Sequence, residues 1–230
     1  MLLKILFTVS TLLILTAMIM TLNACSLGTS SAATFAGAFP NPKLDTPLAK
    51  NRGEQTVVLA GGCFWGIEAV FEHVKGVKSA ESGYAGGSTD TADYETVSSG
   101  QTGHAESVRI TYDPSQVTYG QLLKVFFAVA HDPTQLNRQG PDTGTQYRSA
   151  IFYANEEQKR IAEGYVAQLD EAKVFSGKIV TQVVPLKSFH EAEGYHQNYL
   201  VNHPNEPYIV YNDLPKLKAL QKELPELYKK

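Results

Sequence analysis

The sequence predicts an α+β fold: a two-layer sandwich in which helices cover a mixed sheet built on a ferredoxin-like split β-α-β core. The first observation behind this prediction is the order of the pattern. From residue 56 onward, short apolar or alternating runs and amphipathic segments follow one another as β-α-β-β-α-β. The second is composition, since 43% hydrophobic and 19% charged residues are typical of a globular chain. The third is the lack of any internal repeat in the sequence, which favours one domain.

The predicted core begins with a strand over 56–60, which is a short β-branched run. Apolar residues then recur at helical spacing and predict a helix over 64–74 with one buried face. A second strand is expected over 77–84, followed by a loop over 85–93 that is rich in Gly, Ser, Thr and Asp. Residues 105–112 alternate with period two and predict the third strand.

The second half of the core is expected to begin at Thr118, whose hydroxyl is suited to cap the helix that follows it. The loop over 132–146 is long for a compact domain, and loops of that length are usually functional or disordered. We interpret it as a wall of the site. The remaining elements expected are a strand over 150–153, a helix over 156–170, a strand over 179–184 and helices over 190–201 and 214–228.

Residues 1–25 are expected to form a lipoprotein signal peptide. Lys4 is their only charged residue, and it precedes an apolar run from Ile5 to Met20. The next segment, Leu22-Asn23-Ala24-Cys25, resembles a bacterial lipobox, in which the cysteine is lipidated and becomes the mature N-terminus. An uncleaved membrane anchor is the alternative, because the apolar run could span a bilayer. Either interpretation predicts an extracytoplasmic domain attached to a membrane of the bacterial cell envelope.

Cys63 is expected on the first turn of a helix, within the stretch Gly61-Gly62-Cys63-Phe64-Trp65-Gly66. The glycine pair allows a sharp turn from strand to helix. Unpaired N–H groups and the helix dipole favour an anion there, so the position predicts a lowered pKa and an exposed thiolate. The alternative is that Cys63 is a small buried hydrophobic residue, as free cysteine often is.

The same stretch resembles the active-site signature of the peptide methionine sulfoxide reductase A family. Four further motifs continue the resemblance in the family's order over roughly residues 56–200: Gly83-Tyr84-Ala85-Gly86-Gly87, Gly103-His104-Ala105-Glu106, His131-Asp132-Pro133 and Gly144-Thr145-Gln146-Tyr147-Arg148-Ser149. The resemblance implies thiol-dependent reduction of methionine S-sulfoxide, free or in proteins, through a sulfenic acid on Cys63. It also implies a catalytic domain over 56–212, which we expect to follow a flexible tether over 26–55 and to precede a helical tail over 213–230.

Reduction of a sulfoxide requires a nucleophile and an acid that meets the departing oxygen. Cys63 supplies the nucleophile. Glu106 is the candidate acid, because an inward position on the strand over 105–112 would bury its carboxyl and raise its pKa. The resemblance implies the same role for the Glu of Gly-His-Ala-Glu. The alternative is an outward Glu106 paired with a surface lysine.

The resemblance also assigns the substrate pocket. Tyr94 and Tyr147 match the family tyrosines whose hydroxyls hydrogen-bond the sulfoxide oxygen, and Asp142 matches the acidic residue before Gly-Thr-Gln-Tyr. The aromatic residues Phe64 and Trp65 suit an apolar pocket for the methyl group of methionine, where rings also contact sulfur favourably. His196 matches a family motif without an assigned role.

No metal is expected. His190 and His196 are six residues apart, whereas the zinc motif of proteases needs histidines four apart on one helix face. A net charge of −3 gives no electrostatic reason to expect nucleic acid. The expected partners are oxidised proteins or free methionine sulfoxide, a thioredoxin-like reductant and, through Cys25, a membrane. We expect a monomer.

Turnover is where the sequence departs from much of the family. The chain has two cysteines, and lipidation would consume Cys25. Ser98 and Asn198 stand in two neighbourhoods where many members place a resolving cysteine. We therefore expect a one-cysteine enzyme that needs no cofactor, whose sulfenic acid is reduced directly by an external thiol such as thioredoxin.

Two other functions remain open at the level of sequence. A cysteine hydrolase or acyltransferase would need a histidine base beside Cys63, and no His-Asn or His-Asp pair is evident. A non-catalytic surface lipoprotein would carry Cys63 as an ordinary thiol.

Overall fold

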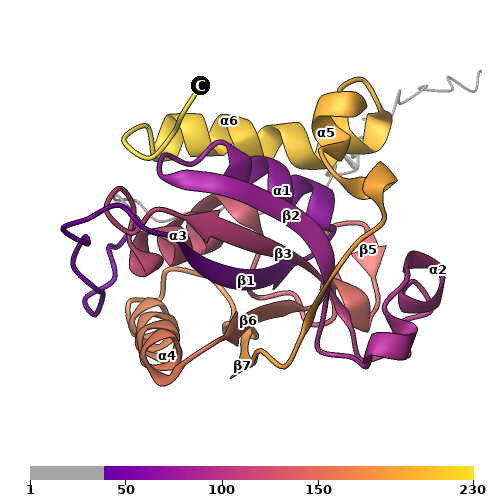
Figure 1. The fold of residues 1–230 in the computed structure, drawn as a ribbon, viewed down its shortest axis with the longest axis horizontal. Helices are drawn as coiled ribbons and strands as arrows, with labels where there is room; N and C mark the ends of the chain where they lie inside the picture. Colours follow the sequence, from indigo (N-terminus) through magenta and orange to yellow (C-terminus); the bar gives the residue numbers. More distant parts are fainter. Residues whose placement is uncertain (1–38) are drawn as a thin grey trace, which may run out of the picture.

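The computed structural model describes residues 39–230, so the expected signal peptide and Cys25 lie outside the described residues. Six strands form one mixed sheet in the order β7-β6-β1-β3-β2-β8 (Figure 1). The strands are β1 (Gln55–Gly61), β2 (Val77–Ala85), β3 (Ala105–Tyr112), β6 (Ser149–Tyr153), β7 (Gln182–Pro185) and β8 (Phe189–Glu191). A separate hairpin consists of β4 (Arg138–Gln139) and β5 (Asp142–Thr143).

The four central strands confirm the predicted split arrangement. β3 lies antiparallel between β1 and β2, and β6 lies antiparallel to β1 on its other side. The chain therefore crosses from β1 to β2 through one helical connection and from β3 to β6 through a second. β7 pairs parallel with β6, which makes the sheet mixed as expected.

The α-helices are α1 (Phe64–Glu72), α2 (Tyr94–Val97), α3 (Tyr119–Val125), α4 (Glu156–Glu171), α5 (Tyr199–Asn202) and α6 (Leu214–Glu223). Shorter turns are the 3-10 helices η1 (Thr89–Thr91), η3 (Thr145–Tyr147) and η4 (Gly194–His196) and the π-helices η2 (Phe126–Ala130) and η5 (Ile209–Asp213). Thr118 caps α3 as predicted, because its hydroxyl accepts from the Gln121 backbone N–H at 3.1 Å. The Gln121 side chain accepts from the Thr118 N–H at 2.9 Å in return, which completes a capping box.

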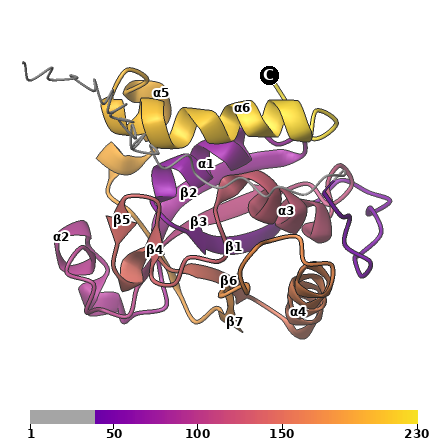
Figure 2. The same ribbon diagram turned by 180° about the vertical axis from the view of Figure 1, so that it is seen from behind.

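Apolar side chains cover both faces of the central sheet. Along β1, Val57 and Leu59 join the large core beneath the helices, while Val58 and Ala60 join a smaller cluster on the opposite face. In Figure 2, which views the molecule from behind, α3 lies in front of the sheet. Since both faces of β1 are buried, the strand reads as a continuous apolar run rather than an alternating one.

The prediction of a helix over 190–201 is wrong. This segment instead forms β8, η4 and α5, and β8 adds to the edge of the sheet beside β2. Gly83 allows this approach, because a Cβ there would lie 2.3 Å from the carbonyl oxygen of His190. The Gln197 side chain accepts from the Ser82 N–H and donates to the Ser82 carbonyl, both at 3.0 Å. Asn198, with φ +54°, then interrupts any continuous helix.

The two ends of the described chain pack more closely on the domain than expected. The tether expected over 26–55 is docked from residue 39, because the Tyr165 hydroxyl donates to the Pro40 carbonyl at 2.6 Å and Asp45 accepts from the Gly120 N–H at 2.9 Å. The final helix ends at Glu223 rather than at residue 228. Three leucines of the expected tail belong to the large core: Leu220, Leu224 and Leu227.

Within residues 39–230, no helix has the length and apolar character needed to cross a membrane.

Candidate active site

The turn between β1 and α1 is approached closely by three distant segments. A Cβ on Gly61 would lie 3.0 Å from the ring of His131, and one on Gly62 would lie 2.5 Å from the Gln139 side chain. A Cβ on Gly66 would lie 2.1 Å from an Asp213 carboxylate oxygen. Gly62 also has φ +99°, a conformation that favours glycine. The glycines therefore leave room for the loop and the C-terminal segment to close around Cys63.

Cys63 is the N-cap residue of α1, directly before the first turn on which it was expected, but the residue is 7% exposed rather than open to solvent. Burial raises its pKa well above the usual value, and the negative charges of Glu106 and Asp213 add to the increase. A hydrogen bond from the Trp65 backbone and the charge of Lys216 act in the opposite direction. The expected lowering of the Cys63 pKa is therefore wrong, because desolvation outweighs the helix terminus.

Glu106 lies on the inward face of β3 and is 3% exposed. One of its carboxylate oxygens accepts from the Phe64 backbone N–H at 3.1 Å, at the first residue of α1. Burial raises the pKa of Glu106 to about 8, the Phe64 hydrogen bond lowers it and the charge of Asp142 raises it further. Glu106 is therefore a protonated acid at neutral pH, next to the Cys63 turn.

Tyr94 and Tyr147 contribute two hydroxyl groups near Cys63 and Glu106. Tyr94 is the first residue of α2, and its backbone N–H donates to Glu193 at 2.9 Å. Tyr147 ends η3. Burial raises the pKa of both phenols, and the charges of Glu106 and Cys63 contribute to both increases. Both hydroxyls therefore stay protonated and can donate hydrogen bonds at neutral pH.

The loop over 132–146 forms the wall that we predicted for it. The Gln139 side chain packs on Gly62 through its Cβ and Cγ atoms. Its amide accepts from the Asp132 N–H at 3.2 Å and donates to the Asp132 carbonyl at 3.1 Å. The loop continues through the β4–β5 hairpin to Asp142, whose carboxylate accepts from the Tyr208 hydroxyl. Burial raises the pKa of Asp142, and the hydrogen bond from Tyr208 lowers it.

Aromatic rings line the other side of the turn. Trp65 donates from Nε1 to Nδ1 of His196 at 3.2 Å and stacks on Tyr199 at 3.7 Å between ring centroids. The ring of His196 also lies 4.4 Å from that of Tyr94, and burial lowers its pKa. Phe64 is 1% exposed and packs 5.0 Å from His196, so it supports this wall from beneath. Trp65 is the partly exposed ring of the predicted pair.

The C-terminal segment contributes residues that were not predicted from the sequence. Tyr208 lies in the expected catalytic domain over 56–212 without an expected role, and Asp213 and Lys216 lie in the expected helical tail over 213–230. Asp213 shortly before Pro215 is a pattern typical of a helix start, so the sequence gives no sign that the Asp213 side chain contacts α1. In the structure the Asp213 side chain makes no capping bond and instead pairs with Lys216 at 3.0 Å. Figures 1 and 2 show α2, α5 and β5 toward the same end of the molecule.

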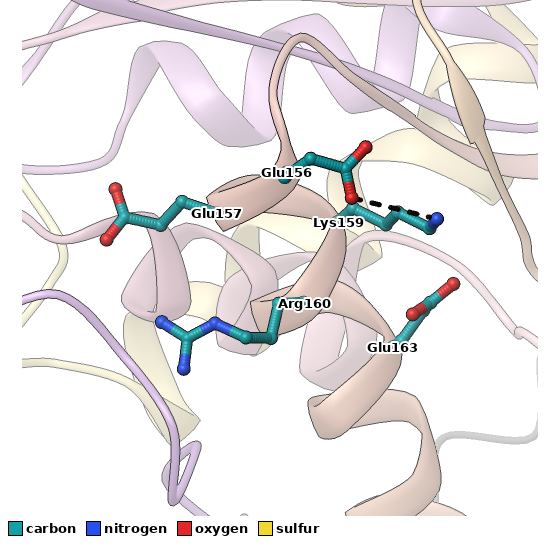
Figure 3. Close-up of a pocket in the computed structure, with 5 residues that line it drawn as sticks. All are labelled: Glu156, Glu157, Lys159, Arg160 and Glu163. Carbon is teal, nitrogen blue, oxygen red and sulfur yellow. Dashed lines mark ion pairs between the residues drawn. The ribbon is translucent and has the colours of Figure 1, made fainter.

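A hollow on the outer face of α4 is lined by Glu156, Glu157, Lys159, Arg160 and Glu163, all from one helix (Figure 3). Its one ion pair joins Lys159 and Glu156 at 3.8 Å, so it has the character of a solvated surface. Among residues 39–230, no three His, Cys, Asp or Glu side chains are grouped to hold a metal ion, and Cys63 is the one free cysteine.

Comparison with curated proteins gives relatives over most of the chain. The chain is 61% identical over 176 residues to a peptide methionine sulfoxide reductase of Mesorhizobium japonicum, covering 76% of this chain and 90% of the relative. A peptide methionine sulfoxide reductase of Synechocystis is 48% identical over 208 residues, covering 90% of this chain and 97% of the relative.

Solved structures agree with these relatives. Methionine sulfoxide reductase A of Corynebacterium diphtheriae has a TM-score of 0.58 at 37% identity, covering 76% of this chain and 90% of that one. The reduced form of Mxr1 from Saccharomyces cerevisiae has a TM-score of 0.59 at 32% identity, covering 69% of this chain and 94% of that one. A model of the family described as peptide methionine sulfoxide reductase matches residues 55–227. The chain therefore belongs to the peptide methionine sulfoxide reductase family.

Proposed function

We propose that this chain reduces methionine S-sulfoxide to methionine, with Cys63 as the nucleophile and Glu106 as the acid. The family assignment makes the chain an oxidoreductase that reduces methionine sulfoxide, and the roles of individual residues are our proposal. The observation that carries it is the meeting of a buried thiol, a protonated carboxyl and two phenols at one helix start.

In the proposed step, the Cys63 sulfur attacks the electrophilic sulfoxide sulfur and forms a transient bond between the two sulfurs. The sulfoxide S–O bond then breaks as its oxygen is transferred to the Cys63 sulfur, and the bond between the two sulfurs breaks as methionine leaves. Glu106 gives a proton to the sulfoxide oxygen, and its carboxylate recovers a proton from the thiol. The products are methionine and the Cys63 sulfenic acid, so the sulfoxide is reduced by two electrons and Cys63 is oxidised by two. Burial keeps the Cys63 thiol protonated in the free enzyme. The thiol therefore gives its proton to Glu106 only after Glu106 has given its own proton to a bound sulfoxide.

Substrate orientation follows from the two sides of the turn. The hydroxyls of Tyr94 and Tyr147 donate to the sulfoxide oxygen, and the partly exposed ring of Trp65 contacts the methyl group. His196 holds the Trp65 ring through its hydrogen bond, and Phe64 packs on His196. Asp142, which accepts from Tyr208, completes the pocket. A sulfoxide is chiral at sulfur, so a site with oxygen donors on one side and an aromatic wall on the other accepts one epimer. By the family resemblance this is the S epimer.

A hydrolase is less well supported by the same geometry. His131 is buried, and its two ring nitrogens contact the Phe126 carbonyl at 2.9 Å and the Ser149 hydroxyl at 2.7 Å. Burial lowers its pKa to about 4. His196 uses Nδ1 to accept from Trp65. Neither imidazole is therefore arranged as a base for the Cys63 thiol.

We propose that an external thiol regenerates the enzyme without a cofactor. Cys63 is the one free cysteine among residues 39–230, and the remaining cysteine of the chain is Cys25. A thiol of a thioredoxin-like protein attacks the sulfenic sulfur, water leaves, and a second thiol of that protein releases Cys63 from the mixed disulfide.

We propose further that Cys25 is lipidated and that the enzyme acts as a monomer in the bacterial cell envelope, where it repairs oxidised exported proteins. The proposal is supported by the signal-like sequence of residues 1–25, which ends at Cys25.

The role of Glu106 predicts a pH dependence. Since the acid must be protonated, kcat/KM is expected to be constant below pH 8 and to fall as pH rises through the Glu106 pKa of about 8. The substitution Glu106→Gln should lower kcat/KM by about 10²- to 10⁴-fold and abolish the fall of kcat/KM at alkaline pH. The matched control is Glu68→Gln, another buried carboxyl, which should keep it. An alkaline decrease that survives in Glu106→Gln would contradict the assignment.

The one-cysteine cycle predicts the state of the protein after a single turnover. When full-length protein with an unmodified Cys25 reacts with one equivalent of methionine sulfoxide and no reductant, intact mass should show one added oxygen, which a sulfenic acid reagent traps on Cys63. The matched control Cys63→Ser should remain unmodified. A disulfide between Cys63 and Cys25 would refute direct regeneration by an external thiol.

Lipidation of Cys25 predicts that the full chain, expressed in bacteria, enters the detergent phase of a phase-separation experiment. Cys25→Ser should shift the protein to the precursor form and prevent metabolic labelling with a fatty acid. Labelling that persists in Cys25→Ser would show that the attached lipid is elsewhere.

A further inference from the structure

Asp213 is a buried carboxylate that the proposed mechanism does not use. It ends η5 and is 0% exposed. Its Oδ1 accepts from Lys216 Nζ at 3.0 Å, whereas its Oδ2 has no hydrogen-bond partner among the described residues. A buried acceptor without a donor is destabilising, so its presence calls for a physical explanation.

The carboxylate of Asp213 lies at the start of α1. Its Oδ1 would be 2.1 Å from a Cβ on Gly66, the third residue of that helix. Cys63 is the N-cap of the same helix and lies three residues before Gly66, and residues three apart lie on the same side of a helix. The sulfur and the Asp213 carboxylate therefore face the same turn. Their electrostatic coupling agrees, because Asp213 raises the pKa of the thiol.

The other polar groups near this turn are already engaged or are donors. Glu106 accepts from the Phe64 N–H and carries its own proton at neutral pH. Asp142 accepts from Tyr208. Tyr94 and Tyr147 have raised pKa values and are proton donors. Oδ2 of Asp213 is thus an acceptor at this turn that remains available when Cys63 acquires a hydroxyl group.

We propose that Asp213, held in place by Lys216, accepts a hydrogen bond from the hydroxyl of the Cys63 sulfenic acid and keeps that intermediate protonated until a reducing thiol arrives. This inference rests on the proposed function, because it requires the sulfenic acid to form. An enzyme without an internal resolving cysteine holds this intermediate for as long as the external thiol takes to bind, so its protection has a direct use.

Protonation matters because the next oxidation is a nucleophilic step. The sulfenic sulfur attacks hydrogen peroxide, an oxygen atom is transferred to sulfur, and water leaves, so Cys63 becomes a sulfinic acid. The neutral sulfenic acid is a weaker nucleophile than its anion. A carboxylate that accepts the S–O–H hydrogen disfavours the anion, both through the hydrogen bond and through like charge.

The test separates formation of the sulfenic acid from its survival. Wild type, Asp213→Asn and the double variant Asp213→Leu/Lys216→Met each react with one equivalent of methionine S-sulfoxide without reductant, and the methionine released is measured. Hydrogen peroxide is then added, and intact mass follows conversion of the sulfenic to the sulfinic acid. Tyr211→Ala, an exposed neighbour, is the control.

We expect all four proteins to release methionine, and sulfinic acid to form on the order of tenfold faster in both Asp213 variants than in wild type, since one charge-assisted hydrogen bond is lost. The Tyr211→Ala control should match wild type. If neither Asp213 variant accelerates sulfinic acid formation, the inference is overturned, even if methionine release is slower. If wild type itself releases no methionine, the proposed function fails instead. The double variant retains no buried lysine charge, so it remains informative if Asp213→Asn does not fold.

Discussion

The close approach of three distant segments to the turn after β1 is the constraint on which the site depends. His131, Gln139 and Asp213 each occupy the space that a side chain at Gly61, Gly62 or Gly66 would need. These contacts bring the loop over 132–146 and the C-terminal segment against one cysteine. A larger residue at any of the three glycines would displace one of these partners, because their side chains are packed against the backbone itself.

Burial dominates the electrostatics that result from this packing. The helix start offers N–H groups and a positive dipole end, which favour a thiolate on Cys63. Desolvation and the nearby carboxylates nevertheless raise its pKa, and desolvation likewise raises that of Glu106. The free site therefore stores both protons that the reaction needs. In our account the enzyme does not expose a reactive thiolate while idle, and the bound sulfoxide triggers proton transfer.

The sequence was informative where local chemistry determines structure. Thr118 predicted a helix start, because a capping signal depends on neighbouring residues. For Glu106 the pattern of residues 105–112 left an inward and an outward position open, and the family resemblance favoured the inward one, where the side chain lies. The order of the four central strands followed from the order of the elements.

Prediction failed where contacts between distant residues decide the outcome. Residues 190–201 have the composition of a helix, but bonds from Gln197 to Ser82 and the left-handed Asn198 convert them into an edge strand and short turns. Tyr208 and Asp213 carry no local signal of their partners, because Asp142 and Gly66 are far from them in sequence. The predicted lowering of the Cys63 pKa was wrong for the same reason, since desolvation is a property of the assembled fold.

The most direct test of the account is the stereochemical course of the reaction. Soluble protein comprising residues 26–230 is incubated with dithiothreitol and racemic methionine sulfoxide, and chiral chromatography resolves the remaining epimers. The account predicts loss of the S epimer alone, and no loss with Cys63→Ser. Consumption of both epimers, or unchanged activity in Cys63→Ser, would contradict a site built around the Cys63 thiol with oxygen donors on one side and an aromatic wall on the other.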